Sequence, residues 1–277
     1  MLRWIPTRWR RFSLRSLLIA LTLVGVAAGV VGTHLRNRLH IHSLRQLITS
    51  ANCQPWIYES SSRLGALEYH LGMIMPIDAI SPEGFVALQQ AAKMVDPRRT
   101  QHVRYVALRS AHNGQADLQR TQKIIEAFSP PRLVLHRLDP AAATFFLNNC
   151  TSGSISVQQR GDWSSTTDIK LNCPVFIYSG GGFSNFWRCV SPESSVKCLE
   201  VYASPAELQS IYPIPTLQEV TISTGHMDEC DVVQLMSRLQ GALVKLECCG
   251  IDEEQAIRLR ETFAPQLLLQ RSDCLHP

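Results

Sequence analysis

The chain has 277 residues, 45% of them hydrophobic and 18% charged, which suffices for one large folded domain or a repeat array. Its formal net charge is +4, but eight of the 27 basic residues lie at or before Arg45, and all 23 acidic residues come later. The remainder therefore has 19 basic and 23 acidic residues, a net charge of −4. Because a domain that binds nucleic acid is expected to be basic, nucleic acid is excluded as a partner.

The N-terminal segment joins a basic stub to an apolar run. Residues 1–15 contain five arginines, and the 18 residues from Ser16 to Thr33 carry no charge. As a helix these residues would be about 27 Å long, close to the ~30 Å of a membrane's hydrocarbon core. We therefore predict a cytoplasmic stub at 1–15 that faces anionic lipid headgroups, a single-pass transmembrane helix at 16–33, and an extracytoplasmic domain after it.

Two other interpretations of this segment stay open. A cleavable signal peptide has the same charged and apolar parts, and Val26-Ala27-Ala28 before Gly29 is an acceptable cleavage site. A buried core helix is the third interpretation, and the flanking arginines count against it. We favour an uncleaved signal anchor with the N-terminus in the cytoplasm.

Residues 34–100 are expected to form a membrane-proximal helical cap region. His34 to Ser50 carry an imperfect apolar stripe at helical spacing. Trp56 to Glu59 are a short candidate strand. Ser81-Pro82-Glu83 is a helix start, with Ser81 as the N-cap and Pro82 at the first helical position.

An internal repeat runs through residues 101–277. Five short segments share an apolar-x-x-apolar-x-apolar pattern, with last positions at 108, 201, 222, 248 and 269, and three weaker matches end at 135, 157 and 178. The steps between these eight positions in chain order are 27, 22, 21, 23, 21, 26 and 21 residues, within the ~20–29 residues of leucine-rich repeats. Candidate helices lie between several strands, at 115–128, 204–207, 228–239 and 252–263. The fold class predicted is α/β, a degenerate leucine-rich-repeat-like solenoid of parallel strands alternating with helices, least regular at 151–192.

The start of the chain resembles that of a large set of bacterial membrane-anchored proteins. Their R-F-S-[LI]-R-[ST]-L-L motif is matched by Arg11-Phe12-Ser13-Leu14-Arg15-Ser16-Leu17-Leu18. Some of these proteins carry a degenerate leucine-rich-repeat ectodomain, and Leu217 to Ser223 are similar to the L-x-x-L-x-L-x core of such repeats. The Asn or Cys that usually follows the strand is replaced by Ser204, Gly225 and Ile251, so no regular asparagine ladder is expected. Most members have no assigned function, so the resemblance implies an ectodomain of the interaction type.

The sequence contains no catalytic signature such as a P-loop, a G-x-S-x-G elbow or an H-E-x-x-H motif. Ser179 to Gly182 could cradle an anion, but the segment lacks the lysine of a P-loop, and a flexible loop is favoured. Possible metal ligands gather between His226 and Asp231, where acids at a helix start would complement the helix dipole. We therefore predict that the protein is not an enzyme and has no cofactor or metal site.

The nine cysteines include no Cys-x-x-Cys pair. Their odd number and irregular spacing resemble neither a disulfide framework nor a zinc ribbon, although an exported chain could oxidise some of them. Most are expected to be small buried hydrophobic residues. Cys249 is a candidate reactive thiol, because alternation along its strand would expose it.

The candidate functional surface is the exposed side of the strands. In a repeat solenoid the apolar pair of each strand points inward, and the alternate residues line the concave surface. The predicted partner-binding residues are Tyr105, Arg109, Arg132, His136, Glu200, Tyr202, Glu219, Thr221, Ser223, Lys245 and Glu247, followed by Gln266 and Gln270. Their polar, charged and Tyr content suits protein–protein interaction, and a merely solvated sheet face would have the same content.

The function expected from these features is that of a single-pass membrane-anchored interaction or scaffold protein of the bacterial cell envelope. Its expected partners are the membrane, through the N-terminal helix, and a protein bound by the sheet face. The alternative is an envelope enzyme whose site is assembled from dispersed residues. Such an enzyme would be expected to show a deep pocket with convergent polar groups, whereas a scaffold would show an open face.

Overall fold

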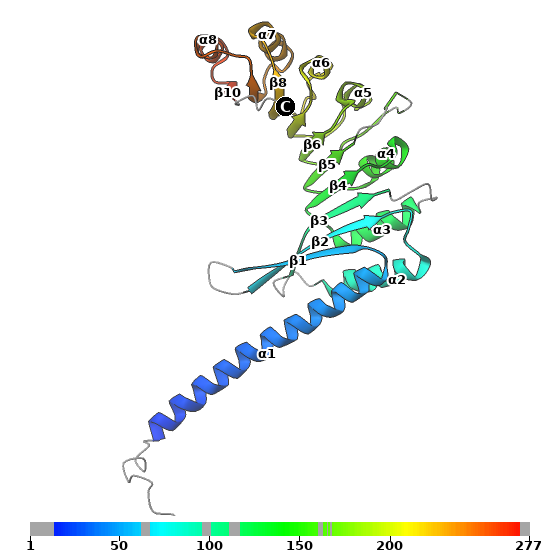
Figure 1. Ribbon diagram of the computed structural model, residues 1–277, viewed down its shortest axis with the longest axis vertical. Coiled ribbons are helices and arrows are strands. Elements are labelled where there is room, and N and C mark those ends of the chain that lie inside the picture. The colour runs from blue at the N-terminus through cyan, green and yellow to red at the C-terminus, as the bar shows by residue number, and fades with distance from the viewer. Residues whose placement is uncertain are drawn as a thin grey trace, which may run out of the picture. The chain divides into compact units, whose positions relative to one another are not determined.

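The computed structural model describes residues 14–61, 67–95, 101–110, 117–159, 163–164, 166 and 168–271 (Figure 1). The chain divides into two compact units, one ending at Gln46 and the other beginning at Leu47. Most of the predicted basic stub lies outside the described residues, as do the start of the predicted 115–128 helix and Cys274.

Helix α1 runs unbroken from Leu14 to Ser50, so the predicted membrane helix and the helix expected after it are one element. It contains an 18-residue window of mean hydropathy 2.1, and no residue of that window is buried. Hydroxyl groups within the apolar part donate hydrogen bonds back to the helix, as from Thr22 to the Leu18 carbonyl and from Thr33 to the Gly29 carbonyl. Among the described residues, α1 is the helix with the length and composition to cross a membrane.

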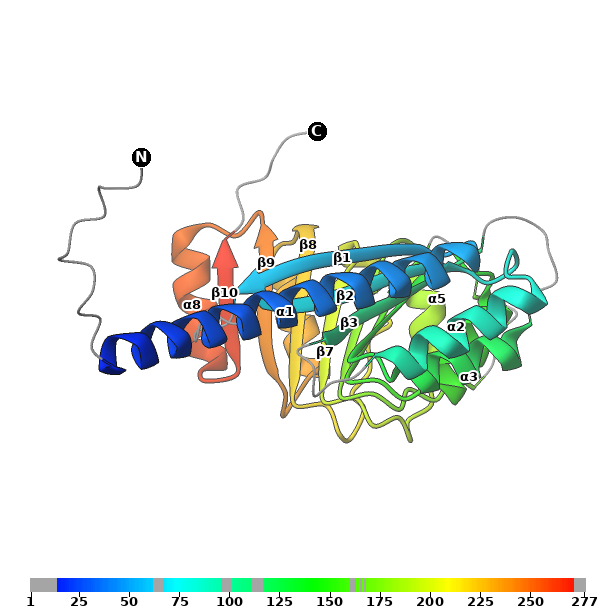
Figure 2. The ribbon, with the colours of Figure 1, turned by 90° about the horizontal axis from the view of Figure 1, so that it is seen from below.

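The second unit is built on a ten-stranded sheet whose strands follow one another in chain order (Figures 1 and 2). The first two strands pair antiparallel, and all later neighbours pair parallel. The strands are β1 (Gln54–Ser61), β2 (Leu67–Pro76), β3 (Gln101–Arg109), β4 (Arg132–His136), β5 (Ser154–Gln158), β6 (Val175–Ser179), β7 (Cys198–Tyr202), β8 (Glu219–His226), β9 (Leu243–Cys249) and β10 (Leu267–Arg271). The predicted α/β class with alternating strands and helices is confirmed.

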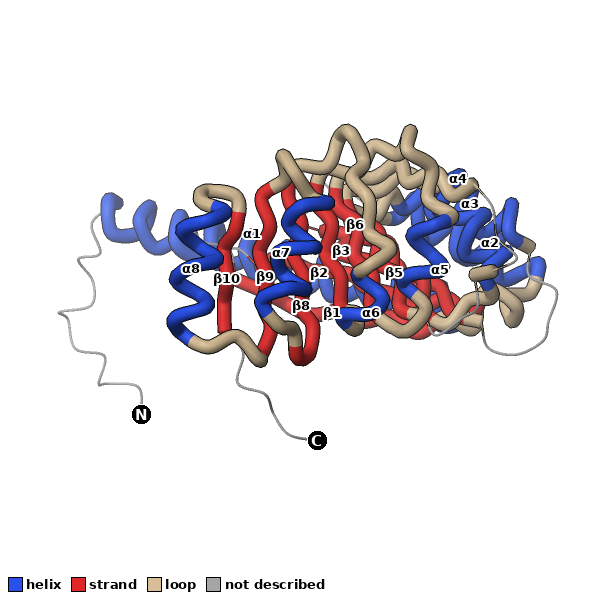
Figure 3. The backbone as a smooth tube through the Cα atoms, turned by 90° about the horizontal axis from the view of Figure 1, so that it is seen from above, coloured by secondary structure: helices blue, strands red, loops and turns tan. Residues whose placement is uncertain are grey.

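Within the described residues, seven helices lie along one side of this sheet (Figures 1 and 3). They are α2 (Pro82–Met94), α3 (Leu118–Phe128), α4 (Pro140–Asn149), α5 (Phe183–Arg188), α6 (Pro205–Leu208), α7 (Glu229–Arg238) and α8 (Glu253–Phe263). Side-chain N-caps begin several of them, and the predicted cap Ser81 accepts a hydrogen bond from the Gly84 amide at 3.0 Å. Such caps fix where each helix starts after its strand.

The core consists of two apolar ladders between the sheet and the helices. Each parallel strand from β3 onward contributes two buried side chains, and these side chains are register partners from strand to strand. The pairs are Val106 and Leu108, Leu133 and Leu135, Ile155 and Val157, Phe176 and Tyr178, Leu199 and Val201, Val220 and Ile222, Val244 and Leu246, and Leu267 and Leu269. Burying one such side chain stabilises the fold by roughly 1.5–3 kcal/mol, so the repeated pair is the main sequence determinant of the sheet.

Two regions differ from the simple pattern. The region predicted as a helical cap contains α2 but also the β1–β2 hairpin, so it is of mixed structure. In the irregular stretch 151–192, the helix α5 has only six residues. There a buried aromatic cluster fills the core instead: the Phe186 ring lies 4.8 Å from Trp163, 5.4 Å from Phe176 and 5.0 Å from Tyr178, measured between centroids.

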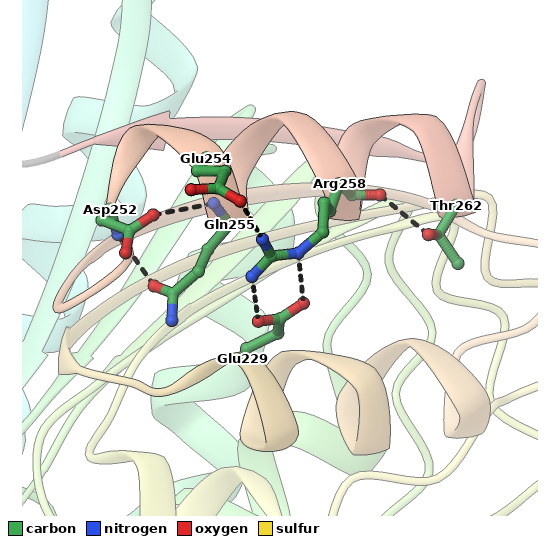
Figure 4. Close-up of polar contacts among 6 residues, drawn as sticks. All are labelled: Glu229, Asp252, Glu254, Gln255, Arg258 and Thr262. Atoms are coloured by element: carbon green, nitrogen blue, oxygen red, sulfur yellow. Dashed lines mark hydrogen bonds and ion pairs between the residues drawn. The ribbon is translucent and has the colours of Figure 1, made fainter.

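Neighbouring helices at the C-terminal end are joined by Arg258 of α8 (Figure 4). Its guanidinium lies 3.0 Å from a carboxylate oxygen of Glu229 on α7 and 2.8 Å from one of Glu254 on α8. Asp252 caps the same helix and accepts a hydrogen bond from the Gln255 amide at 2.7 Å. One arginine thus ties two successive helices of the outer layer together.

Candidate functional site

The side of the sheet opposite helices α2–α8 carries the residues that the sequence predicted as the partner-binding surface. We call this side of β3–β10 the open face. One row across it consists of successive register partners: Arg109, His136, Gln158, Ser179, Tyr202, Ser223, Glu247 and Gln270. The neighbouring row includes Glu200, Thr221 and Lys245 in register. None of the eleven predicted residues is buried, because each alternates with a ladder residue that is.

Charge is unevenly distributed on the open face. Arg109, Arg132 and His136 lie on β3 and β4, whereas Glu200, Glu219 and Glu247 lie on β7–β9. Two of these carboxylates have partners on the same face: Lys245 lies 2.7 Å from Glu219, and Ser223 donates a 2.7 Å hydrogen bond to Glu247. The hydrogen bond to Glu219 and the charge of that carboxylate raise the pKa of Lys245 above its ordinary value.

A hollow of about 340 Å³ lies at the basic part of the open face. We call it the face hollow; it is lined by Ile74, Tyr105, Ala107, Arg109, Arg132, Val134, His136 and Gln158. Four of the predicted residues, Tyr105, Arg109, Arg132 and His136, therefore share one concavity. The other seven lie further along the face or on its far rows.

Glycine at position 72 shapes one wall of the face hollow. Gly72 of β2 is the register partner of Tyr105 of β3, and a Cβ at position 72 would lie 2.3 Å from Tyr105 Cε1. The absence of a side chain thus allows the phenol ring to lie against β2. Burial, together with the neighbouring Tyr58, raises the pKa of Tyr105.

The cationic groups of the face hollow have no acidic partner there. The lining includes no Asp or Glu, and the guanidinium groups of Arg109 and Arg132 form no ion pair or hydrogen bond with any residue that the structure describes. Burial, reinforced by the positive charges of Arg137 and Arg109, lowers the pKa of His136 below 6.5. The lining therefore combines the short apolar side chains of Ile74, Ala107 and Val134, which we call the floor, with the longer polar side chains, which we call the rim and whose arginines attract anions.

A second hollow, of about 750 Å³, adjoins the first at the carboxyl ends of β3–β6. We call it the edge hollow; its lining includes Arg137, Asp139, Gln159 and Ser179, and Gln158 lines both hollows. Gln159 is 4% exposed, and its Oε1 forms no hydrogen bond with any described residue. Asp139 accepts a 2.9 Å hydrogen bond from the Ala142 amide, so its carboxylate caps α4.

Sequence reasoning missed Gly72, Ile74 and Gln158. Ile74 and Gly72 belong to β2, which the repeat pattern did not include. A glycine inside a strand is a known sign of close backbone or side-chain approach and was the available signal. Gln158 was missed because its segment matched the repeat only weakly.

The glycine-rich segment 179–182 ends beside a carboxylate from the same chain, that of Glu207. The backbone amides of Gly182 and Phe183 donate hydrogen bonds of 2.6 and 3.1 Å to Oε1 of Glu207, at the start of α5. Burial acts to raise the pKa of Glu207, but these amides and Ser204 outweigh it, and the pKa lies below its ordinary value. The carboxylate therefore joins α5 to α6 and occupies the amide groups at the end of this segment, for which the sequence had favoured a flexible loop.

Two other sequence hypotheses concern the start of α7 and Cys249. Asp228 and Asp231 form a capping box at the start of α7, and no group of three His, Cys, Asp or Glu residues suited to a metal ion occurs among the described residues. The hypothesis of a reactive thiol at Cys249 is wrong, because Cys249 is disulfide-bonded. Seven other cysteines within the described ranges are free: Cys53, Cys150, Cys173, Cys189, Cys198, Cys230 and Cys248.

Comparison of the chain with protein-family models, curated proteins and solved structures finds no match. The geometry of the two hollows and the open face is therefore the basis for assigning a function.

Proposed function

We propose that this protein is a membrane-anchored binding protein of the cell envelope that holds a protein partner on its open face. The observation that carries the proposal is the open face itself: rows of polar, charged and Tyr side chains stand in register across β3–β10, with helices α2–α8 on the opposite side. Such a surface offers extended contact, and Tyr and Arg are enriched at the centres of protein interfaces.

The architecture that we propose is a degenerate leucine-rich-repeat-like solenoid. Support comes from the 21–27-residue spacing of the strands, the two buried ladders and the strict chain order of the sheet. Each unit buries its apolar pair against its neighbours, which leaves the alternate residues available for binding.

The placement that we propose is single-pass, with the N-terminus in the cytoplasm and the second unit outside. The unburied apolar window of α1 and the arginines before it support this topology. The disulfide at Cys249 also supports it, because disulfides persist in oxidising compartments.

Fractionation with external protease tests the placement. A C-terminal tag that sediments with membranes and is digested in intact spheroplasts is the expected result. A protected tag would overturn the topology, and a digested tag on a shortened, soluble product would favour a cleaved signal peptide.

Site-specific photo-crosslinking tests the binding face. The photoreactive residue p-benzoylphenylalanine would replace Tyr202, which is 50% exposed on the open face, or Ile257, which is 49% exposed on α8. We expect envelope proteins to crosslink at Tyr202 and not at Ile257. Equal crosslinking at both positions, or none at Tyr202, would overturn the assignment of the open face as the partner-binding surface.

The alternative function, an envelope enzyme, would be located at the edge hollow. Active sites of open parallel sheets lie beyond the carboxyl ends of the strands, and Arg137 and Gln159 are polar groups at that edge. A substrate turned over by purified protein, with activity lost in Gln159→Ala, is the result that would favour this alternative.

A further inference from the structure

The face hollow has features of a small-molecule site as well as of a protein contact. Its volume of about 340 Å³ lies at the lower end of the ~300–1,000 Å³ range of ligand pockets. Such pockets have apolar walls and a few polar groups that orient the ligand. The floor is formed by Ile74, Ala107 and Val134, and the polar groups stand at the rim.

The polar residues at the rim favour a negatively charged ligand. Arg109 and His136 are register partners on β3 and β4, and Arg132 lies two residues before Val134 on the same face. Guanidinium groups bind carboxylates through two parallel hydrogen bonds, and Arg109 and Arg132 have these donors free of any described partner. A cationic ligand would meet only like charge, since the lining contains no carboxylate.

We propose that the face hollow binds an organic carboxylate whose apolar group lies on the hydrophobic floor and whose carboxylate pairs with Arg109 and Arg132. Tyr105 forms the aromatic wall against which that apolar group packs. Gln158, which lines both hollows, marks the exit through which a larger ligand continues toward the edge hollow.

This inference rests on the proposed function, since it names the chemical group that the open face recognises. The carboxylate can belong to a free small molecule or to an acidic residue or C-terminus of a bound protein. The chemistry at the hollow is the same in both cases, and the two sources are separated by experiment.

Isothermal titration calorimetry of the full-length protein in phosphatidylcholine nanodiscs tests the proposal. The probes are N-acetylphenylalanine, its neutral amide, and inorganic phosphate. We expect the carboxylate to bind at least about 10-fold more tightly than the amide, because charge-assisted bonds to arginine are lost in the amide. We expect phosphate to bind more weakly than the carboxylate, because it leaves the apolar floor unused.

Three variants locate the binding. Arg109→Gln and Arg132→Gln are each expected to weaken N-acetylphenylalanine binding about 10-fold or more. Arg188→Gln removes the same charge from α5 on the helical side and is expected to leave binding unchanged. Circular dichroism and thermal unfolding establish that each variant is folded.

Several results of the calorimetry would contradict the carboxylate site. No binding by the native protein, equal binding of the amide or of phosphate, or equal loss in Arg188→Gln would each overturn the proposal. Crosslinking at Tyr202 does not depend on a free carboxylate. If Tyr202 crosslinks to a partner but calorimetry detects no carboxylate binding, the carboxylate site is refuted and the proposed protein-binding function stands. Carboxylate binding without crosslinking refutes the protein partner and assigns the carboxylate to a small molecule.

Discussion

The phenol ring of Tyr105 lies against the backbone of Gly72, its register partner on the next strand, so closely that a Cβ at position 72 would come within 2.3 Å of the ring. The two residues are 33 positions apart in the sequence, and neither repeat spacing nor composition links them. Tyr105 lines the face hollow on the side of β2. The position of its ring, and so the shape of the hollow, depends on the absence of a side chain at Gly72.

Gly72→Ala is therefore expected to displace Tyr105 and to lower the free energy of unfolding by about 1–3 kcal/mol, the usual cost of overpacking. In a domain of this size each kcal/mol lowers the melting temperature by about 2–4 °C. Thermal unfolding measures the loss, and calorimetry should show weaker N-acetylphenylalanine binding. Gly181→Ala is the matched control, because a Cβ there meets nothing within 4 Å.

The Tyr105→Ala background gives a further check on the same contact. If the phenol ring is the obstacle, Gly72→Ala in that background should cost much less than in the native protein, as a double-mutant cycle would show. An unchanged cost would mean that Tyr105 is not what the new methyl group meets.

The pKa of His136 is expected to lie below 6.5, because burial and the charges of Arg137 and Arg109 disfavour its protonation. The unfolded chain then binds more protons between the folded pKa and 6.5, so stability rises with pH through that window and falls as the pH drops below 6.5. NMR titration of ¹³C-labelled histidine measures the pKa, and His136→Gln assigns the signal. Arg109→Gln should move this pKa upward, whereas Arg188→Gln should not; a pKa unmoved by both would exclude Arg109 as a cause.

Glu207→Gln is expected to destabilise the protein by roughly 1.5–3 kcal/mol, because the carboxylate accepts hydrogen bonds from Gly182, Phe183 and Ser204. Its depressed pKa adds a pH dependence: this stabilisation is present above about pH 4.5 and is lost as the pH falls through the folded-state pKa. Chemical denaturation at pH 7 measures the difference. Glu193→Gln is the control, since its side chain is 79% exposed and its ion pair with Lys170 is expected to contribute ~0–1 kcal/mol.

The cysteines should separate into three classes on alkylation of the native protein at pH 8. Cys230 is exposed and is expected to react first. Burial raises the pKa values of Cys53, Cys150 and Cys173 to about 12, so these thiols should react only after denaturation. Cys249 should react only after reduction.

Mass spectrometry of unreduced peptides identifies the partner of Cys249. We expect the linked peptide to contain none of the seven cysteines that are free in the described residues. Alkylation of Cys249 without a reductant would contradict the disulfide and would remove one argument for export.

The sequence alone predicted the parallel strands, because each carries the same buried pair two positions apart. It also predicted the helix starts at Ser81, Asp228 and Asp252, where a side-chain oxygen accepts an amide hydrogen bond. These features are local: they depend on periodicity and on capping within a few residues. The alternation that buries Leu133 and Leu135 also placed Arg132 and His136 on the opposite side.

Only the tertiary structure decided which exposed residues meet. It joined β2 to the sheet ahead of the repeats, brought Ile74 beside Val134 in one hollow, and set Tyr105 against Gly72. It also set Glu207, which lies 25 residues from Gly182, against the amide groups at the end of the glycine-rich segment. The physical reason is that such contacts depend on strand register and on the absence or reach of single side chains, which no periodic pattern encodes.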